Sequence, residues 1–314
     1  MPNLQKGPSA IKKKAFADRH YCSDSFLLLH FSYFGGMKNC PQCQIALPDE
    51  ARFCMNCGAR QVVVAGTLPP EQLDWNGEVE HQAFDRLMSR LRSRVEAEQD
   101  ATKVPTYQER LYSSGYRETV QRRLTQWVEE WRSKTPEEKA GAPEALRYLL
   151  DDLLDFFFII HCADLNTVAL PEVMLSYQRR PLSEIDAAKM AMDFLDFERE
   201  EERVYTNFIE LPVKKIRNAG KYFLFPEREE RIWFICDQSL LGNARKGFAM
   251  TEKALYWKSG LQGAQRVYYH KLFSLKREQE WLLINDLYFN ATPSLNTKMI
   301  WLLRRLARLH QAVL

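Results

Sequence analysis

Four cysteines near the N-terminus occur as two C-x2-C pairs separated by ten residues, and this spacing constrains the chain more than any other feature. The pairs are Cys40 with Cys43 and Cys54 with Cys57. Paired cysteines form knuckles, and four thiolates complete a tetrahedral shell around Zn²⁺ at about 2.3 Å. A redox pair and a chance spacing are the alternatives, but two such pairs so close together are typical of zinc binding. We therefore predict one zinc ion per chain.

A shell of four thiolates leaves no open coordination position, so this zinc is predicted to be structural. Metal binding in such small modules contributes on the order of 10 to 16 kcal/mol, which is folding energy for a segment with almost no core. The phrases CPQC and CMNCG resemble the short zinc ribbons at the front of many bacterial proteins of otherwise unrelated function, over residues 38–60. The resemblance implies a local fold and names no partner.

The other three cysteines, Cys22, Cys162 and Cys236, show no pairing pattern. Free thiols beside a thiolate metal site favour a reducing compartment, so we expect the protein in the cytoplasm. The longest apolar stretches, residues 26–34 and 153–160, fall far short of the roughly 20 residues that a membrane helix needs. Any association with the inner membrane is therefore expected to be peripheral.

Length predicts several modules, because 314 residues exceed the usual size of one hydrophobic core. Residues 1–36 are assigned as an N-terminal extension. A coherent ribbon sequence opens at Met37, so we expect translation to begin there. The ribbon occupies residues 37–60, and a linker with glycine and two prolines occupies residues 61–77.

Helical periodicity dominates residues 78–203, where apolar residues recur at three- and four-residue spacing opposite charged faces. One apolar stripe runs from Leu111 to Trp131. Thr135 and Glu138 form a capping box that starts a helix, and Ser183 is expected to cap another. The segment is predicted to be a helical bundle.

From residue 204 on, the sequence changes to short aromatic and β-branched segments between turns. Residues 204–230 are predicted to be a connection, and Asn285-Asp286 a two-residue hairpin turn. A final amphipathic helix is expected to be capped near Ser294 and to bury one apolar face, with Lys298 pointing away from it. The predicted strands are residues 231–236, 247–250, 255–258, 266–269, 273–277, 281–284 and 287–290.

Seven strands followed by one helix is the plan of pleckstrin-homology-like domains, in which a curved antiparallel sheet is closed by a C-terminal helix. Residues 242–258, GNARKGFAMTEKALYWK, resemble the glycine, threonine and aromatic hairpin of bacterial pleckstrin-homology and GRAM-type domains. The resemblance covers roughly residues 231–311 and implies a binding role. The expected fold class is multi-domain α+β: a zinc ribbon, a helical bundle and a pleckstrin-homology-like curved sheet capped by a helix at residues 231–314.

Charge is distributed unevenly between the two larger segments. Residues 78–203 contain 18 basic and 26 acidic residues, whereas residues 204–314 contain 18 and 9. The two halves are therefore expected to attract each other or to face different partners. The candidate ligand-binding residues of the basic half are Arg245 and Lys246, in the loop between its first two strands, with Lys253 and Lys258 nearby. Loops of this kind contact anionic headgroups in pleckstrin-homology domains, and solvated turn residues are the alternative.

Two further patterns are candidates for chemistry. Asp151, Asp152 and Asp155 have the DDxxD spacing that holds magnesium and diphosphate in isoprenoid synthases, but no second metal motif accompanies them, so a solvated face or a partner for the basic half is the better interpretation. His161 and Cys162 are adjacent on a helix and do not face each other. No phosphate-binding loop or nucleophile motif is present in the sequence, so we do not expect an enzyme.

The sequence therefore predicts a non-enzymatic zinc-binding adaptor or scaffold that acts through protein–protein contacts, with no evident small-molecule substrate. One alternative is a nucleic-acid-binding factor that uses the ribbon and the basic half, which predicts a steep salt dependence. A second is recruitment to an anionic membrane surface through the basic loop. A third is an enzyme within the helical segment, which predicts a pocket with converging polar groups and perturbed pKa values.

Overall fold

The structure is a computed structural model that describes residues 37–39, 46–48, 73–75, 77–139, 141–178, 180–259, 262–278 and 280–310. The chain divides into two compact units, an N-terminal unit of residues 1–63 and a main unit of residues 64–314. In the N-terminal unit, β1 (Met37–Asn39) and β2 (Ala46–Pro48) pair as an antiparallel hairpin.

Helices make up the first part of the main unit. Gly115, at a φ of 72°, separates α2 from α3 within what periodicity alone predicts as one helix. Glycine adopts this left-handed conformation without steric cost, which explains why the chain turns there. The helices are α1 (Val79–Glu98), α2 (Val104–Ser113), α3 (Tyr116–Arg132), α4 (Pro136–Lys139) and α5 (Ala142–Phe156), the last continuing into the π-helical turn η2 (Phe157–His161).

The two predicted helix starts have different outcomes. The capping box is confirmed, because Thr135 N donates to Glu138 Oε2 at 2.9 Å and Glu138 N donates to Thr135 Oγ1 at 3.4 Å. The Ser183 cap is wrong, because Ser183 lies in the 3-10 turn η4 (Leu182–Glu184). Asp186 caps α6 (Ala187–Leu195) instead, accepting from Lys189 N at 3.0 Å. Two further 3-10 turns, η3 (Glu172–Tyr177) and η5 (Phe197–Arg199), flank this helix.

The strands described in the main unit form two antiparallel sheets, one in the order β3-β4-β5-β6-β7 and one in the order β10-β9-β8. Residues 204–230, predicted to be a connection, complete the edge strand β3 and contain helix α7 (Val213–Tyr222). Asn285 and Asp286 have φ values of 50° and 63°, as a two-residue hairpin turn requires. The strands are β3 (Arg203–Tyr205), β4 (Ile232–Asp237), β5 (Gly247–Thr251), β6 (Ala254–Lys258), β7 (Gln265–Tyr268), β8 (Leu275–Glu278), β9 (Trp281–Ile284) and β10 (Leu287–Phe289).

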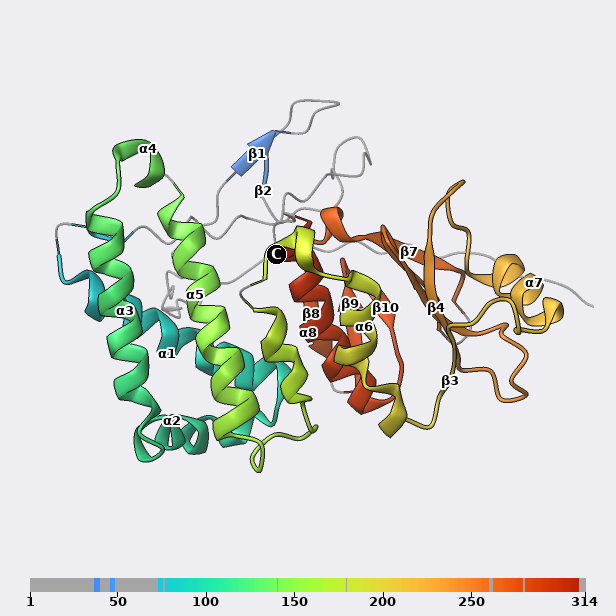
Figure 1. Cartoon of the computed structure of the whole chain (residues 1–314), viewed down its shortest axis with the longest axis horizontal. Helices are drawn as coiled ribbons and strands as arrows, with labels where there is room; N and C mark the ends of the chain where they lie inside the picture. The colour runs from blue at the N-terminus through green and yellow to red at the C-terminus, as the bar shows by residue number, and fades with distance from the viewer. Residues whose placement is uncertain are drawn as a thin grey trace, which may run out of the picture. The chain divides into compact units, whose positions relative to one another are not determined.

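Alternate residues of the larger sheet pack into hydrophobic clusters on its two faces. Phe248 and Met250 of β5 belong to the cluster that includes the C-terminal helix α8 (Pro293–Leu309), whereas Ala249 between them belongs to the cluster around α7. Figure 1 shows the two helices on opposite sides of this sheet. Both faces of its central strands are therefore covered.

Helix α8 is buried on most sides, because it packs against α6 and β9 and also reaches Phe158 through Trp301. Thr292, not Ser294, caps it by accepting from Leu295 N at 3.3 Å. The prediction that Lys298 points into solvent is wrong, since its side chain is only 2% exposed. One continuous core cluster runs from α1 to α8, and the architecture is α+β.

Candidate functional site

The four predicted zinc ligands lie outside the described residues, but the hairpin beside the first pair is described. Strand β1 ends at Asn39, directly before Cys40, and β2 begins at Ala46. The sequence between these two strands contains Cys40 and Cys43, the first predicted pair of ligands. This hairpin and the cysteine donor set fit a structural Zn²⁺, whose binding would supply folding energy to the N-terminal unit.

Three of the four basic candidates lie together. Arg245 and Lys246 end the β4–β5 loop, and Lys258 lies opposite Gly247 in the β5–β6 register. Arg245 and Lys258 approach the ring of Tyr222 in α7, at 5.4 and 5.2 Å from its centroid. Cations are attracted to the face of an aromatic ring, so these contacts hold the positive charges beside α7.

Lys253 lies at the other end of the β5–β6 hairpin. Its Nζ pairs with Glu227 at 3.0 Å, and the Tyr268 hydroxyl donates to the same carboxylate at 2.7 Å. Hydrogen bonds from Tyr268 and Lys253 lower the pKa of Glu227. The structure therefore separates Lys253 from the other three basic candidates.

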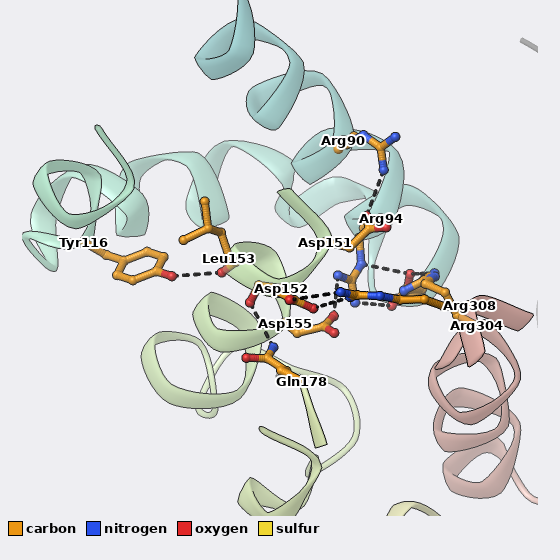
Figure 2. Close-up of polar contacts among 11 residues, drawn as sticks. Arg90, Arg94, Tyr116, Asp151, Asp152, Leu153, Asp155, Gln178, Arg304 and Arg308 are labelled. Atoms are coloured by element: carbon orange, nitrogen blue, oxygen red, sulfur yellow. Dashed lines mark hydrogen bonds and ion pairs between the residues drawn. The ribbon is translucent and has the colours of Figure 1, made fainter. Parts of the chain in front are cut away.

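The three aspartates of the DDxxD sequence lie on α5, and each pairs with an arginine from another helix (Figure 2). Two of the arginines come from α1 and one comes from α8. The pairs are Arg90–Asp151 at 2.8 Å, Arg94–Asp155 at 2.6 Å and Arg308–Asp152 at 2.6 Å. Within the part of the chain that the structure describes, no group of three or more His, Cys, Asp or Glu side chains could hold a metal.

Glu98 of α1 extends this network toward the C-terminal half. Its buried carboxylate accepts from Arg94 at 3.2 Å and also from Arg304 of α8. Burial alone would raise the pKa of Glu98, but the charges of Arg304 and Arg94 outweigh it and lower the pKa. The acidic and basic halves of the chain thus attract each other through α1, α5 and α8.

A small cleft of about 50 Å³ opens beside the network, between α5, η3 and α8. Burial raises the pKa of Asp152 and of Asp155, although an arginine pairs with each. Burial lowers the pKa of Arg305 to about 10, and its guanidinium donates to the carbonyl of Tyr177. Perturbed groups in a cleft are a feature of active sites, but structural ion-pair networks produce the same shifts. The pairing of both aspartates favours the structural interpretation.

His161 and Cys162 pack into their surroundings and do not form a thiolate–imidazole pair. Burial raises the pKa of the Cys162 thiol to about 12, so it stays protonated at neutral pH. The His161 ring packs against Tyr116, with ring centroids 4.7 Å apart.

Sequence reasoning did not find the arginines that pair with the aspartates. Arg90 and Arg94 lie 61 positions from their partners, and Arg308 lies 156 positions from Asp152. No local pattern connects residues so far apart. The opposite net charges of the two halves were a signal for Arg308 alone, because Arg90 and Arg94 belong to the same acidic half as their partners.

Comparison with known proteins bears on the N-terminal unit. The model of a family described as a zinc-ribbon domain matches residues 39–61, which include all four predicted ligands. No curated protein and no solved structure matches the chain. Among the residues described, no helix combines the length and apolar character needed to cross a membrane. Residues 39–61 therefore contain a zinc-ribbon domain.

Proposed function

We propose that the protein is a non-enzymatic zinc-binding adaptor or scaffold that acts through protein–protein contacts. The observation that carries this proposal is the zinc-ribbon domain, which lies in a small compact unit separate from a much larger one. A site with four thiolates has no position for a substrate, so the metal serves to fold a small recognition surface. Such a unit can hold one partner while the main unit contacts another.

The charged network of the main unit supports a structural role for its acidic residues. Asp151, Asp152 and Asp155 each have an arginine partner, whose positive charge balances the carboxylate without a metal ion. The network joins α5 to α1 and α8, and these helices also share the hydrophobic core. We therefore assign the DDxxD sequence to the stability of the fold.

We also propose that residues 231–314 follow the pleckstrin-homology-like plan. The support is the chain order, in which two antiparallel sheets are followed by one C-terminal helix. The edge strand β3, the outer helix α7 and the contact of α8 with α6 are additions to that plan. A domain of this kind serves binding, which agrees with an adaptor.

Nucleic acid is the second candidate partner, and the grouping of Arg245, Lys246 and Lys258 beside Tyr222 is the observation that favours it. Phosphate contacts by basic residues would make binding fall steeply as salt rises. Contacts with a protein through the zinc ribbon would depend on the metal and would survive nuclease treatment.

The test is in vivo crosslinking of the full chain, followed by mass spectrometry of the captured proteins. The variant Cys40→Ser/Cys43→Ser removes two ligands, and the control Gln42→Ser/Gln44→Ser changes the same knuckle without touching a thiolate. We expect a discrete protein that the wild type and the control capture and the cysteine variant does not. Capture that disappears with nuclease would instead identify nucleic acid as the partner, and no enriched protein at all would contradict the adaptor role.

A further inference from the structure

The β4–β5 loop holds two leucines in solvent. Leu240 is 99% exposed and Leu241 is 81% exposed. The loop that carries them is tightly hydrogen-bonded, because the Asp237 carboxylate accepts from Ser239 N and from Ala244 N, both at 3.0 Å. Neither leucine is stabilised by burial within this chain. Exposed apolar groups rimmed by polar residues mark interaction surfaces.

Helix α7 lies against this loop. The buried Asn218 of α7 donates from Nδ2 to the carbonyl of Asn243 at 2.6 Å, and Arg245 of the loop approaches the Tyr222 ring. The helix and the loop therefore form one surface, which we call the α7–loop surface and define as residues 207–222 and 239–246. Figure 1 shows α7 on the side of the larger sheet opposite α8.

The exposed face of α7 is apolar along one edge and basic along the other. Val213 and Ile216 are exposed on the helix, and Ile209 just before it is 97% exposed. The helix contains no acidic residue. Its exposed basic residues are Lys214, Arg217 and Lys221. A helix with this distribution is suited to lie in the plane of a membrane surface, with its apolar edge below the headgroups.

We propose that the α7–loop surface binds the surface of an anionic phospholipid bilayer. Leu240 and Leu241 enter the boundary between headgroups and acyl chains, and the basic residues of α7 contact lipid phosphates, together with Arg245 and Lys246. Charge complementarity supports this occupant, because Glu210 is the single acidic residue in the two segments of the surface.

The leucines distinguish a bilayer from nucleic acid as the occupant. Both would attract the basic residues, but a phosphate backbone offers no apolar phase to two leucines held at a loop tip, whereas a bilayer does. The inference goes beyond the adaptor role because it assigns a second binding surface in the main unit, and it does not depend on the zinc ribbon.

The test is co-sedimentation of the full chain with vesicles of phosphatidylcholine, with and without phosphatidylglycerol. We expect binding to the vesicles that contain phosphatidylglycerol. Lys214→Gln/Arg217→Gln/Lys221→Gln should weaken it by roughly 100-fold, since each basic residue near an anionic membrane contributes about fivefold. The matched control is Arg92→Gln/Arg122→Gln/Lys134→Gln, which removes the same charge from exposed positions of the helical segment and should bind as the wild type does.

The variant Leu240→Ser/Leu241→Ser keeps every charge and should lower vesicle binding by at least about tenfold. Its melting temperature should equal that of the wild type, because both leucines are already in solvent; a single Leu240→Ser variant repeats the test if the double variant unfolds.

Failure of the wild type to bind either vesicle would overturn the proposal, as would equal losses in the α7 and control variants. Binding that ignores the leucines and is displaced by duplex DNA would identify a nucleic-acid surface instead. The Cys40→Ser/Cys43→Ser variant should bind vesicles normally, which separates this outcome from failure of the adaptor role.

Discussion

Replacement of Lys298 by methionine should destabilise the main unit strongly, because it leaves a buried carboxylate without its counter-charge. Lys298 Nζ donates to Glu200 Oε1 at 2.7 Å and to the carbonyl of Leu195 at 3.1 Å. The two charged side chains are only 2% and 5% exposed. Ser294 Oγ also donates to Glu200, at 2.6 Å, so the carboxylate is held at the start of α8.

The size of the effect follows from this burial. Removal of one member of a buried pair costs about 3 to 5 kcal/mol, because the remaining charge keeps its desolvation cost and loses its partner. Glu200→Gln should cost somewhat less than Lys298→Met, since Asp196 lies 3.9 Å from Nζ and retains part of the attraction. The double variant leaves neither charge unpaired, so its loss should fall short of the sum of the single losses by at least about 2 kcal/mol.

Thermal unfolding of the four proteins measures these differences. A loss of 3 to 5 kcal/mol lowers the melting temperature of a unit of this size by about 6 to 20 °C. Lys189→Met is the matched control, because it makes the same substitution in an exposed pair, Lys189 with Asp193 at 2.6 Å. Exposed pairs contribute about 0 to 1 kcal/mol, so the control should melt within a few degrees of the wild type. Single effects that add without coupling, or a Lys298→Met shift no larger than that of the control, would refute the assignment of a buried pair.

Three further predictions follow from buried groups in the main unit. Leu306→Ala should lower stability by about 2 to 5 kcal/mol in thermal or urea unfolding, since Leu306 is fully buried in the shared core and a cavity adds to the lost transfer energy; a loss below about 1 kcal/mol would contradict that burial. Cys162, whose pKa burial raises to about 12, should resist iodoacetamide at about pH 8 until the protein is denatured, and peptide mass spectrometry that finds it alkylated in the native state would show the thiol to be accessible. Folding lowers the pKa of Glu98, so the stability contributed by its ionised carboxylate is fully present above its ordinary pKa of 4.5 and is lost as the pH falls through the folded pKa. The melting temperature of Glu98→Gln should therefore fall less than that of the wild type between about pH 6 and pH 3. Superimposable melting temperatures over this pH range would contradict the lowered pKa.

The sequence predicted the strands well where each carries its own local signal. Phe248, Ala249 and Met250 form a short apolar run between Gly247 and a charged turn, and such a run indicates a strand covered on both faces without knowledge of any partner. The turn at Asn285 and Asp286 was predictable because these residue types accept positive φ values at low cost. In both cases the information lies within a few consecutive residues.

Tertiary contacts decided the elements that the sequence did not predict. Helix α7 buries only Asn218 and Ala219, which are a polar and a small residue, so it lacks the stripe of large apolar residues that marked the other helices in the sequence. Lys298 looked like a solvent-facing residue because its partner Glu200 lies 98 positions away. Whether such residues are buried depends on which distant segments pack against them, and the periodicity of one segment does not carry that information.

The same distinction applies to the candidate sites. The spacing of Cys40 and Cys43 is local and diagnostic, whereas the α7–loop surface requires α7 and the β4–β5 loop to come together. The available signal was a pair of leucines beside Gly242 in a polar loop. It indicates a binding surface only when the structure shows that Leu240 is exposed.

Zinc content tests the central claim most directly. Elemental analysis of the purified full chain should find one zinc per chain, and Cys40→Ser/Cys43→Ser should lose it, because the two remaining thiolates cannot complete the tetrahedral shell. The main unit should keep its melting temperature in that variant, since residues 64–314 form a separate compact unit. A wild-type protein without zinc, or a double variant that retains a full equivalent, would contradict the assignment of the four cysteines as ligands.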